Sequence, residues 1–583
     1  MPRFGGLQLP DVTIPPTIHA LLAARLDSLE REERAVIEPA SVIGHVFAED
    51  AVRELAPEPL QEQTPTLLGA LSTKQFVRPD PTERAFQNAH RFRHILIRET
   101  TYDGLLKRAR AALHERFVVW ADRVNGDRAM EYEEILGYHL EQAYRYLGEL
   151  GPLDDHGHAL GADGARRLSA AGRRARARGD LTAAVSLLER AAGLLPELDS
   201  ARLQILPELG ETLVDLGRFE AAGSILEEAA EAARTTGDVR LGADAQLRTL
   251  LLELRTGGAD HWSEQAIPLI EQAIATFDAA DDHAGLARAY RVLGYVHGTA
   301  CQYGDAAAAC EQALEQARLA GDRKEERVNA TSYALAACWG PTPVDEAITR
   351  CEEILGQVTA NRLSRGWVLC LLAHLHAMKE DFDTARELYR NGRAAMEELG
   401  EGWYVAWTAL SSARVELLAG DAHAAEAELR RGFDLLEQMG ERYLRSTLTA
   451  LLARAAESLG RLDEAEELTQ LAEELAGPDD VETQAAWRSV RAKVFVDRGR
   501  LEEAARLSQE ALQLLLPTDS AVMKVETLAG LGEVFALLGE PTAAWAFNEA
   551  LTLSEAKGNA AAVAVLRRSL GRPEAEPALR ADP

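Results

Sequence analysis

The sequence predicts an all-α protein in which a long solenoid of helical hairpins follows a smaller, different N-terminal unit. Three observations support this prediction. Short turns that end in alanine recur about every 40 residues over most of the 583-residue chain. Apolar residues at three- and four-residue spacing flank each turn, as they do in amphipathic helices. Residues 1–150 lack the repeat, which marks them as a separate unit.

The composition is that of a folded, soluble chain. Hydrophobic residues make up 47% and charged residues 27% of it, which is too apolar for a disordered protein. No apolar run reaches the roughly 18 residues that a membrane-spanning helix needs, and the N-terminus carries no export signal, so we expect a cytoplasmic protein. The cysteines are odd in number and form no C-x-x-C pair, which predicts reduced core thiols. They are Cys301, Cys310, Cys338, Cys351 and Cys370.

Charge is unevenly distributed along the chain. Its 63 Lys and Arg residues and 93 Asp and Glu residues give a net charge of −30. Residues 1–180 carry only −3 of this charge, and the remainder carries −27. Because such a field repels phosphate backbones and anionic lipid, we expect the solenoid to bind neither nucleic acid nor a membrane.

Ten turns define the repeat, at intervals of 38 to 44 residues. Their final alanines are Ala184, Ala222, Ala266, Ala306, Ala347, Ala385, Ala425, Ala465, Ala504 and Ala544. In several copies a glycine stands where the first helix must stop, because glycine accepts the left-handed conformation of a C-terminal cap. These glycines are Gly217, Gly420, Gly460, Gly499 and Gly539. The alanine opens the second helix, where a larger side chain would overpack the hairpin.

One hairpin cannot bury its own apolar face, so the array should stack into a superhelix with a concave surface. The repeat resembles the tetratricopeptide motif, since a Leu-Gly pair lies thirteen residues before the turn alanine at Leu209-Gly210, Leu293-Gly294 and Leu531-Gly532. That motif commonly has a period of about 34. The longer period here is similar to the repeats of the bacterial maltose-regulon activator and its relatives. HEAT-like repeats share a period near 40 but do not use this turn.

The N-terminal unit has its own order of elements. The patterns predict three helices followed by a two-stranded wing, with the second helix broken near Pro39. A long helix comes after the wing. The corresponding segments are 17–29, 30–44, 67–79, 91–106 and 107–124.

This unit resembles the winged-helix domain that follows the ATPase core in bacterial signalling ATPases. That family includes adenylate/guanylate cyclases with ATPase and tetratricopeptide regions, and large regulators similar to the maltose activator. The matching residues are 14–18, 22–27, 40–44, 92–99 with Tyr102, and 134–143. The family's Walker A motif needs a Gly-Lys pair, and the sequence contains none. We therefore expect no enzymatic activity, cofactor or metal in this chain.

The resemblance implies a division into a leader at 1–16, a winged-helix-like domain at 17–150, a tetratricopeptide-like solenoid at 151–555 and a flexible tail at 556–583. It also implies the function of a sensor, in which the solenoid binds a partner or effector and the winged-helix unit relays that event. The relay would act on a nucleotide-hydrolysing domain present in cis or in trans. Two alternatives are a stand-alone tetratricopeptide scaffold and a DNA-binding transcriptional regulator.

Two groups of basic residues are candidates for anion-binding surfaces. The arginines of the first set either bind phosphate or form a solvated helix face that pairs with acidic residues of the next repeat, and the acidic solenoid favours pairing. They are Arg166, Arg167, Arg173, Arg174, Arg176 and Arg178. The second set lies on the predicted wing. It continues onto the helix after the wing, and it would contact DNA phosphates in a DNA-binding winged helix, or the ATPase core in the family that the unit resembles. Its residues are Arg91, Arg93, His94, Arg98, Lys107, Arg108 and Arg110. We favour the second interpretation.

A metal site at His90 and His94 is disfavoured, because both lie in an apparent strand beside arginines whose charge opposes a cation. Aromatic residues are more informative, since they crowd the first helices of the middle repeats. If those helices line the concave surface, their aromatic and polar side chains would bind a protein, a peptide or a small effector. The alternative is ordinary packing between repeats. The candidate residues are Tyr290, Tyr295, Asn329, Tyr333, Trp367, Trp403, Trp407 and Arg414.

Overall fold

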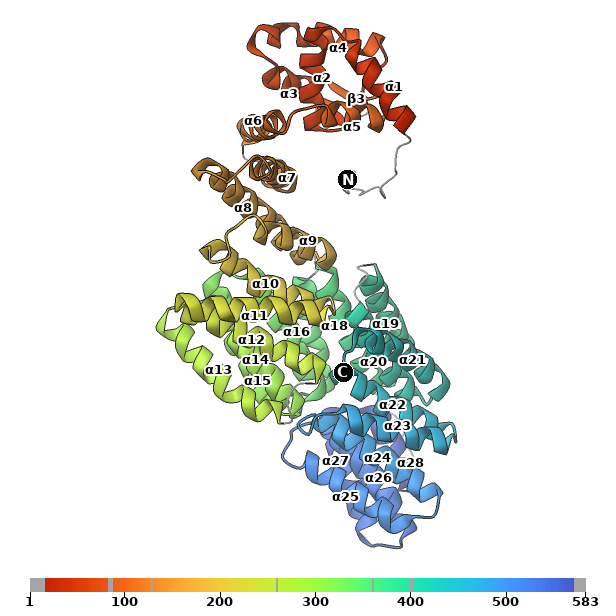
Figure 1. Ribbon diagram of the computed structural model, residues 1–583. Helices are drawn as coiled ribbons and strands as arrows, with labels where there is room; N and C mark the ends of the chain where they lie inside the picture. The colour runs from red at the N-terminus through yellow and green to blue at the C-terminus, as the bar shows by residue number, and fades with distance from the viewer. Residues whose placement is uncertain are drawn as a thin grey trace, which may run out of the picture. The chain divides into compact units, whose positions relative to one another are not determined.

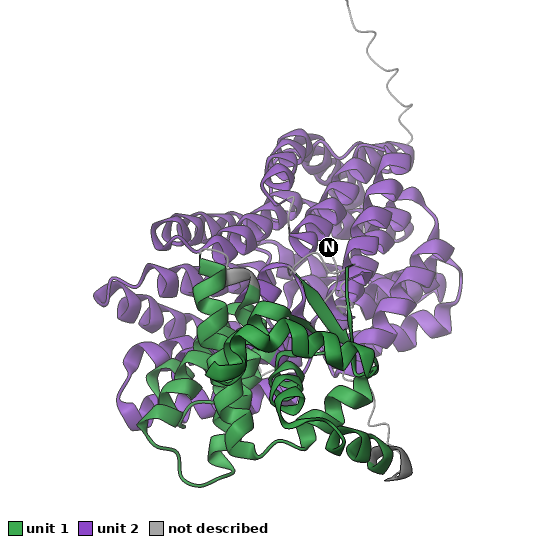
Figure 2. Ribbon diagram, turned by 90° about the horizontal axis from the view of Figure 1, so that it is seen from above, with its two compact units in different colours: residues 1–172, 187–202 green, residues 173–186, 203–583 purple. Residues whose placement is uncertain are grey.

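The structure is a computed structural model that describes residues 16–81, 88–126, 129–257, 261–358, 361–398 and 402–570. These residues form 28 α-helices and three short strands (Figure 1). Nearly all of the expected leader, and residues 571–583 of the expected tail, lie outside this range. The chain divides into two compact units (Figure 2). Unit 1 comprises residues 1–172 and 187–202, and unit 2 comprises residues 173–186 and 203–583.

Unit 1 begins with short helices and strands and continues into longer helices. Its elements are α1 (Pro16–Asp27), α2 (Arg31–Ile43), β1 (Val46–Ala48), α3 (Glu49–Leu55), the 3-10 helix η1 (Glu58–Gln63), α4 (Thr64–Thr73), β2 (Val77–Pro79), β3 (Ala89–Phe92), α5 (Ile95–Asp103), α6 (Lys107–Asn125) and α7 (Ala129–Gly148). The long helix expected at 107–124 is therefore present as α6.

The strands form an antiparallel sheet in the order β1-β3-β2, so the described sheet has one strand more than the predicted wing. Val46 pairs with Arg91, and Val77 pairs with Phe92. Phe47 and Phe92 are fully buried and join a core with apolar residues of α2 and α4. The strand β1 has only three residues, which is too short for an alternating pattern to reveal it.

Two local predictions in this unit are wrong. Helix α2 runs through Pro39 to Ile43 without a break, because burial of Ile37, Ala40 and their neighbours outweighs the single backbone hydrogen bond that proline removes. His94 does not lie in a strand. It is the N-cap of α5, where its Nδ1 accepts a hydrogen bond from the amide of Leu96 at 3.1 Å.

The solenoid consists of ten hairpins in the described residues, followed by one further helix. The hairpin α8 (Asp155–Ala177) and α9 (Leu181–Ala192) contributes residues to both units. The other helices are α10 (Ser200–Asp215), α11 (Phe219–Thr236), α12 (Val239–Thr256), α13 (Trp262–Ala279), α14 (His283–Thr299), α15 (Tyr303–Ala320), α16 (Arg323–Trp339), α17 (Val344–Gln357), α18 (Arg362–Met378), α19 (Phe382–Glu397), α20 (Gly402–Ala419), α21 (Ala422–Met439), α22 (Tyr443–Ser458), α23 (Leu462–Leu475), α24 (Val481–Asp497), α25 (Leu501–Leu515), α26 (Ala521–Leu537), α27 (Thr542–Lys557) and α28 (Ala560–Ser569).

The turn chemistry predicted for these hairpins is confirmed. The five cap glycines have φ between 73° and 78°, in the left-handed region. Nine of the ten turn alanines are buried, but Ala544 is exposed. In that last hairpin the buried position is shifted by two residues, and Ala546 occupies it. The five cysteines are buried free thiols, as expected.

The turn alanine allows a direct test of close helix packing. Ala465 is fully buried and packs with Ala456 and Val494. We expect Ala465→Leu to lower the free energy of unfolding by about 1–3 kcal/mol through overpacking. The same change at the exposed Ala544 should stay within about 0.5 kcal/mol of wild type. Urea denaturation followed by far-UV circular dichroism measures both variants, and equal losses would show that the alanine is not a packing requirement.

Consecutive turns of the superhelix touch each other within unit 2. Asp479 accepts hydrogen bonds from the Ser263 amide (2.7 Å) and hydroxyl (2.9 Å) at the start of α13. Asp519 accepts bonds from the amides of Tyr303 (2.7 Å) and Gly304 (2.6 Å) at the start of α15. The partners are separated by 215 or 216 residues, so the solenoid completes a turn in a little over five hairpins.

The C-terminal helices complete this closure. Lys557 donates to three carbonyl groups that follow or end α16. Helix α28 lies within the expected flexible tail, but it packs Leu566 against Val525 and Leu528 of α26. No helix in the described residues is both long and apolar enough to cross a bilayer.

Candidate functional site

One position of the repeat faces the superhelix axis in most copies. It lies eleven residues before the turn alanine, on the first helix of each hairpin, and eight of the ten side chains there line one of two internal cavities. The first helices therefore line the concave interior, as the repeat predicts. The residues at this position are Arg173, Glu211, Arg255, Tyr295, Ala336, His374, Arg414, Arg454, Lys493 and Glu533.

We call the first cavity the N-terminal chamber. It has a volume of about 140 Å³ and is enclosed mainly by the first helices from α8 to α20. Six cationic side chains and two carboxylates line it, together with four aromatic rings. The charged residues are Arg176, Arg248, Arg255, Arg291, Lys324, Arg327, Glu211 and Asp215, and the aromatic residues are Tyr295, Trp367, Trp403 and Tyr404.

Glu211 is the electrostatic centre of this chamber. Its carboxylate is only 3% exposed and accepts from four cations. Arg291 donates at 2.9 Å and Lys324 at 3.2 Å, while Arg176 lies at 3.2 Å and Arg248 is in direct contact. These five side chains come from five successive first helices, so the cluster holds the inner wall of the first superhelical turn together.

Positive charge remains in excess around this carboxylate. Burial, with the charge of Arg176, lowers the pKa of Lys324 to about 7. Burial also lowers the pKa of Arg248, and the neighbouring Arg288, Arg176 and Arg291 lower it further. The protonated forms of Lys324 and Arg248 are therefore disfavoured in this cluster, and an added negative charge would reduce that cost.

Two stacked indoles, those of Trp367 and Trp403, form part of the chamber wall. Trp367 lies 3.8 Å from Trp407 and 5.9 Å from Trp403, measured between ring centroids, and both pairs are nearly parallel. The guanidinium of Arg255 lies 3.6 Å above the ring of Trp403. The buried Nε1 of Trp367 has no hydrogen-bond partner in the described part of the chain.

We call the second cavity the C-terminal chamber. It has a volume of about 210 Å³ and lies between the first helices from α16 to α26 and α28. Its charges are balanced by the pairs Arg454–Glu526 (2.9 Å), Lys493–Glu533 (3.7 Å) and Arg414–Glu482. His374 is 4% exposed, and burial lowers its pKa to about 3. Neither of its ring nitrogens has a partner among the described residues.

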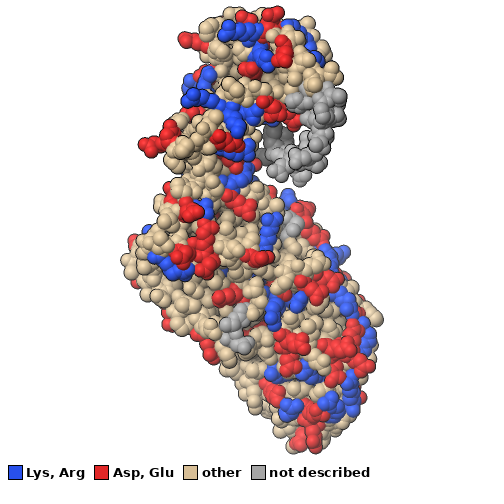
Figure 3. Space-filling view, viewed as in Figure 1, with Lys and Arg blue, Asp and Glu red and all other residues tan. Residues whose placement is uncertain are grey.

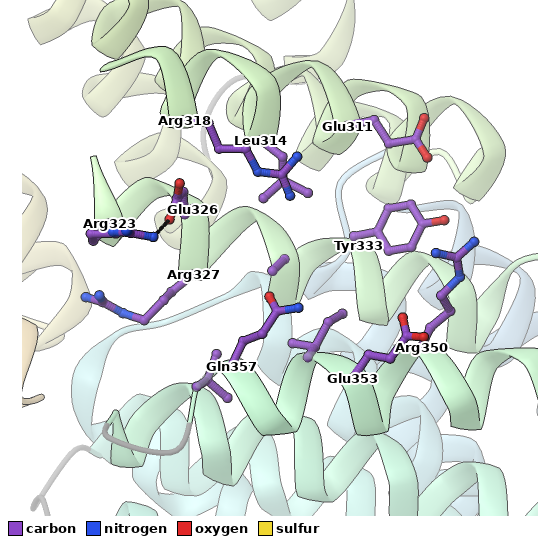
Figure 4. Close-up of a pocket in the computed structure, with 13 residues that line it drawn as sticks. Glu311, Leu314, Arg318, Arg323, Glu326, Arg327, Tyr333, Arg350, Glu353 and Gln357 are labelled. Carbon is purple, nitrogen blue, oxygen red and sulfur yellow. Dashed lines mark hydrogen bonds and ion pairs between the residues drawn. The ribbon is translucent and has the colours of Figure 1, made fainter. Parts of the chain in front are cut away.

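A third hollow lies between α15, α16 and α17, with a volume of about 1040 Å³. Figure 4 shows the ring of Tyr333 between the side chains of Glu311 and Arg350 in this groove. Arg323 pairs with Glu326 at 2.9 Å along its edge. Four basic and three acidic side chains line this groove, so its charges are more nearly balanced than those of the N-terminal chamber.

The predicted concave-face residues do not form one site. Tyr295, Trp367 and Trp403 line the N-terminal chamber, and Trp407 lies behind Trp367 with 7% exposure. The other four are distributed elsewhere: Arg414 lines the C-terminal chamber, Tyr333 lines the groove, Tyr290 packs on the core of α12–α14, and Asn329 is fully buried and donates to the Glu325 carbonyl.

The basic residues of the wing are largely engaged within unit 1. Arg91 pairs with Asp80 at 2.6 Å, and Arg98 donates from Nε to the Ser41 carbonyl at 2.8 Å. Arg93 is exposed. Figure 3 shows basic and acidic side chains mixed over the described surface of unit 1 on the face in view. Contact between the basic residues of the wing and a partner stays a prediction.

The arginine run in α8 pairs with acidic residues, as the sequence analysis favours. Arg173 donates to Glu208 at 2.9 Å, and Arg176 pairs with both Glu211 and Asp215 in the next hairpin. The helix face is not uniformly solvated, however, because Arg167 and Arg176 are 7% and 8% exposed. The run therefore builds structure in both units.

Charge reversal at Arg98 and at Arg93 tests whether each arginine stabilises unit 1 or is free to contact a partner. We expect Arg98→Glu to destabilise unit 1 by about 1–3 kcal/mol, because it removes the hydrogen bond to Ser41 and places a carboxylate beside that carbonyl. Arg93→Glu should change stability by less than about 0.5 kcal/mol. Thermal unfolding of both variants checks this prediction, and an unchanged Arg98→Glu midpoint would return Arg98 to the candidate contact surface.

No group of three or more His, Cys, Asp or Glu side chains in the described residues could hold a metal ion. The helix pairs, their left-handed glycine caps and their buried turn alanines define an α-solenoid of tetratricopeptide-like hairpins.

Comparisons with known proteins give no family for this chain. The sequence matches no protein-family model and no curated protein. Among solved structures, a Rap protein complexed with Competence and Sporulation Factor is 13% identical, covers 62% of this chain and 99% of its own, and has a TM-score of 0.45. The APC/C hetero-tetramer Cut9–Hcn1 is 14% identical, covers 81% and 92%, and has a TM-score of 0.45. A signal transduction ATPase with a tetratricopeptide repeat sensor from Pyrococcus horikoshii is 11% identical, covers 96% and 68%, and has a TM-score of 0.27. At these values the likeness carries no information on ligands or activity.

Sequence reasoning missed the cationic wall of the N-terminal chamber. Glu211, Arg255 and Tyr295 share the position eleven residues before the turn alanine, and that register was an available signal. Arg248 lies 18 residues before the turn alanine of its hairpin, and Arg291 lies 15 residues before its own. No single position of the repeat therefore contains the whole cluster. The superhelical twist brings different positions of successive copies to the axis.

Proposed function

We propose that this chain is a ligand-sensing solenoid in which an effector bound in the N-terminal chamber is reported to unit 1. The observation that carries the proposal is the continuity of α8. Its C-terminal part supplies Arg176 to the chamber wall. Its N-terminal part belongs to unit 1 and holds Arg167, which donates to Asp122 of α6 at 3.0 and 2.7 Å. The proposed relay is a displacement of α8 as one rigid helix, which carries Arg176 in its C-terminal part and Arg167 in its N-terminal part.

The proposed output is a contact between unit 1 and a nucleotide-hydrolysing domain. The support is the resemblance to signalling ATPases, together with a small antiparallel sheet packed on short helices, as a winged-helix lever would require. The domain would be present in cis or in trans. The mass of the protein in its native cell separates these cases, since a mass near 63.5 kDa means that any such domain acts in trans.

The relay can be tested without knowing the effector. Arg176→Met removes the contacts to Glu211 and Asp215, and hydrogen exchange then reports whether α6 responds. We expect amides around Asp122 to exchange about tenfold faster, because the end of α8 loses its anchor. Arg178→Met is the matched control, since Arg178 is exposed on the same chain segment.

Faster exchange near Glu211 with unchanged exchange in α6 would refute the relay. That outcome would favour the stand-alone scaffold, in which the solenoid binds its partner without signalling to unit 1. DNA binding is less well supported, because Arg91 and Arg98 already have partners within unit 1.

A further inference from the structure

We propose that the N-terminal chamber binds a small organic anion. Its carboxylate or phosphate group would lie against Arg255, Lys324 and Arg327, and a planar apolar part would lie against Trp367 and Trp403. It rests on the proposed function, since the site is the same chamber.

The charge of the chamber wall is the first reason. Six cations and two carboxylates line it, although the whole chain carries −30. Both lining carboxylates are already engaged, Glu211 by four cations and Asp215 by Arg176. Uncompensated charge in a partly desolvated cavity is costly, so an anion entering the chamber would gain more than it does in water.

Carboxylates behind the wall offset part of this excess, and they are shared among its cations. Glu208 lies near Arg176 and Lys324 as well as Arg173, and Glu441 lies near Arg255. Glu325 is committed to Arg291 at 3.1 Å and to Lys324 at 3.5 Å. Asp244 is shared by Arg248 at 3.2 Å and Arg288 at 2.7 Å. Glu325 and Asp244 are therefore each shared between two cations.

Arg255 and Arg327 line the chamber and have N–H groups that are not used in an ion pair. Neither Arg255 nor Arg327 forms an ion pair with a carboxylate in the described part of the chain. Burial lowers the pKa of Arg327, and the nearby Asp322 and Glu326 offset only part of this effect. A guanidinium presents a planar fork of N–H groups that matches carboxylate and phosphate oxygens. Arg255 stacks on Trp403, so its edge donors stay available to a ligand.

The size of the chamber limits the ligand. A volume of about 140 Å³ is close to that of cavities that hold one benzene molecule. Trp367 and Trp403 line the chamber beside this space, and the unpaired Nε1 of Trp367 can donate to a further acceptor. The ligand class is therefore one planar ring bearing an acidic group, rather than an extended peptide.

The same arrangement predicts a pH dependence. Lys324, with its pKa near 7, is the side chain that an anion would keep protonated. Binding is then coupled to proton uptake, and affinity should fall by up to about tenfold per pH unit above pH 7. The charged groups facing Lys324 are Arg176 of α8, Glu208 and Glu211 of α10, Arg248 of α12, Arg291 of α14 and Glu325 of α16.

The test uses the full chain and three probes that share one ring. Benzoate carries a carboxylate, phenyl phosphate carries a phosphate, and benzamide is the neutral isostere of benzoate. We expect at least one anion to bind about tenfold or more tightly than benzamide, as a charge-assisted hydrogen bond requires. Isothermal titration calorimetry and quenching of tryptophan fluorescence measure binding, and the preferred anion distinguishes carboxylate from phosphate ligands.

Variants place the binding in the chamber. Arg255→Met should weaken benzoate binding about tenfold or more, and Arg240→Met, an exposed position on the same helix, should leave it unchanged. Equal binding of benzamide and benzoate, no binding of either anion, or binding of hexaglutamate in place of benzoate would overturn the proposal. If an anion binds but hydrogen exchange in α6 is unchanged in Arg176→Met, the relay is refuted and the ligand class stands. If hydrogen exchange in α6 responds to Arg176→Met but no anion binds, the ligand class is refuted and the relay stands.

Discussion

Glu211→Gln is expected to lower the free energy of unfolding of the solenoid by about 3–5 kcal/mol, the cost of removing one partner from a buried ionic cluster. Glutamine keeps the shape of the side chain and removes only its charge. Arg176, Arg248, Arg291 and Lys324 would then face one another without the carboxylate that they share. Since these cations come from different hairpins, the loss should spread over the first superhelical turn.

Urea denaturation followed by circular dichroism measures the loss, and hydrogen exchange locates it in α10, α12 and α14. The matched control is Glu220→Gln, because Glu220 is exposed on the second helix of the same hairpin. It should stay within about 0.5 kcal/mol of wild type. If Glu211→Gln behaves like this control, the cluster does not hold the inner wall together.

Lys557→Met should lower the free energy of unfolding by about 2–4 kcal/mol, since buried carbonyl groups would lose a charged donor. The side chain is 2% exposed, and its Nζ donates to the carbonyls of Ala337 (3.0 Å), Gly340 (2.8 Å) and Thr342 (2.5 Å). Methionine has a similar length but no donor. The expected result is faster exchange in α28 and at the end of α16, where consecutive turns of the superhelix meet.

The pH dependence of stability gives a second measurement for Lys557. Burial lowers its pKa from 10.5 to about 8 in the folded state. Between pH 8 and 10.5 the folded form then binds fewer protons than the unfolded form, so the free energy of unfolding of the wild type should rise with pH over this range. This contribution disappears as pH falls through 8, because both forms are then protonated. Lys557→Met should lack this rise. Lys379→Met, at an exposed ion pair with Asp345, is the control and should cost less than about 1 kcal/mol.

The local structure of the solenoid was predictable because its causes are local. A glycine such as Gly460 ends one helix and an alanine such as Ala465 opens the next, and six residues of sequence contain both. The aromatic enrichment also pointed to the concave interior, since Tyr295, Trp367 and Trp403 do line the N-terminal chamber. The short strand β1 and the cap at His94 were missed, because three residues or one side chain give no periodic pattern.

The charged site depends on the tertiary structure. Glu211 and Lys324 are 113 residues apart in the sequence, and Lys557 lies 220 residues from Ala337. Whether such residues meet depends on the small rotation added at each hairpin, which accumulates over five copies into one superhelical turn. The amino-acid sequence alone therefore determined the hairpins, their caps and the acidic character of the solenoid. Only the accumulated twist decided which charges meet at the axis and which consecutive turns come into contact.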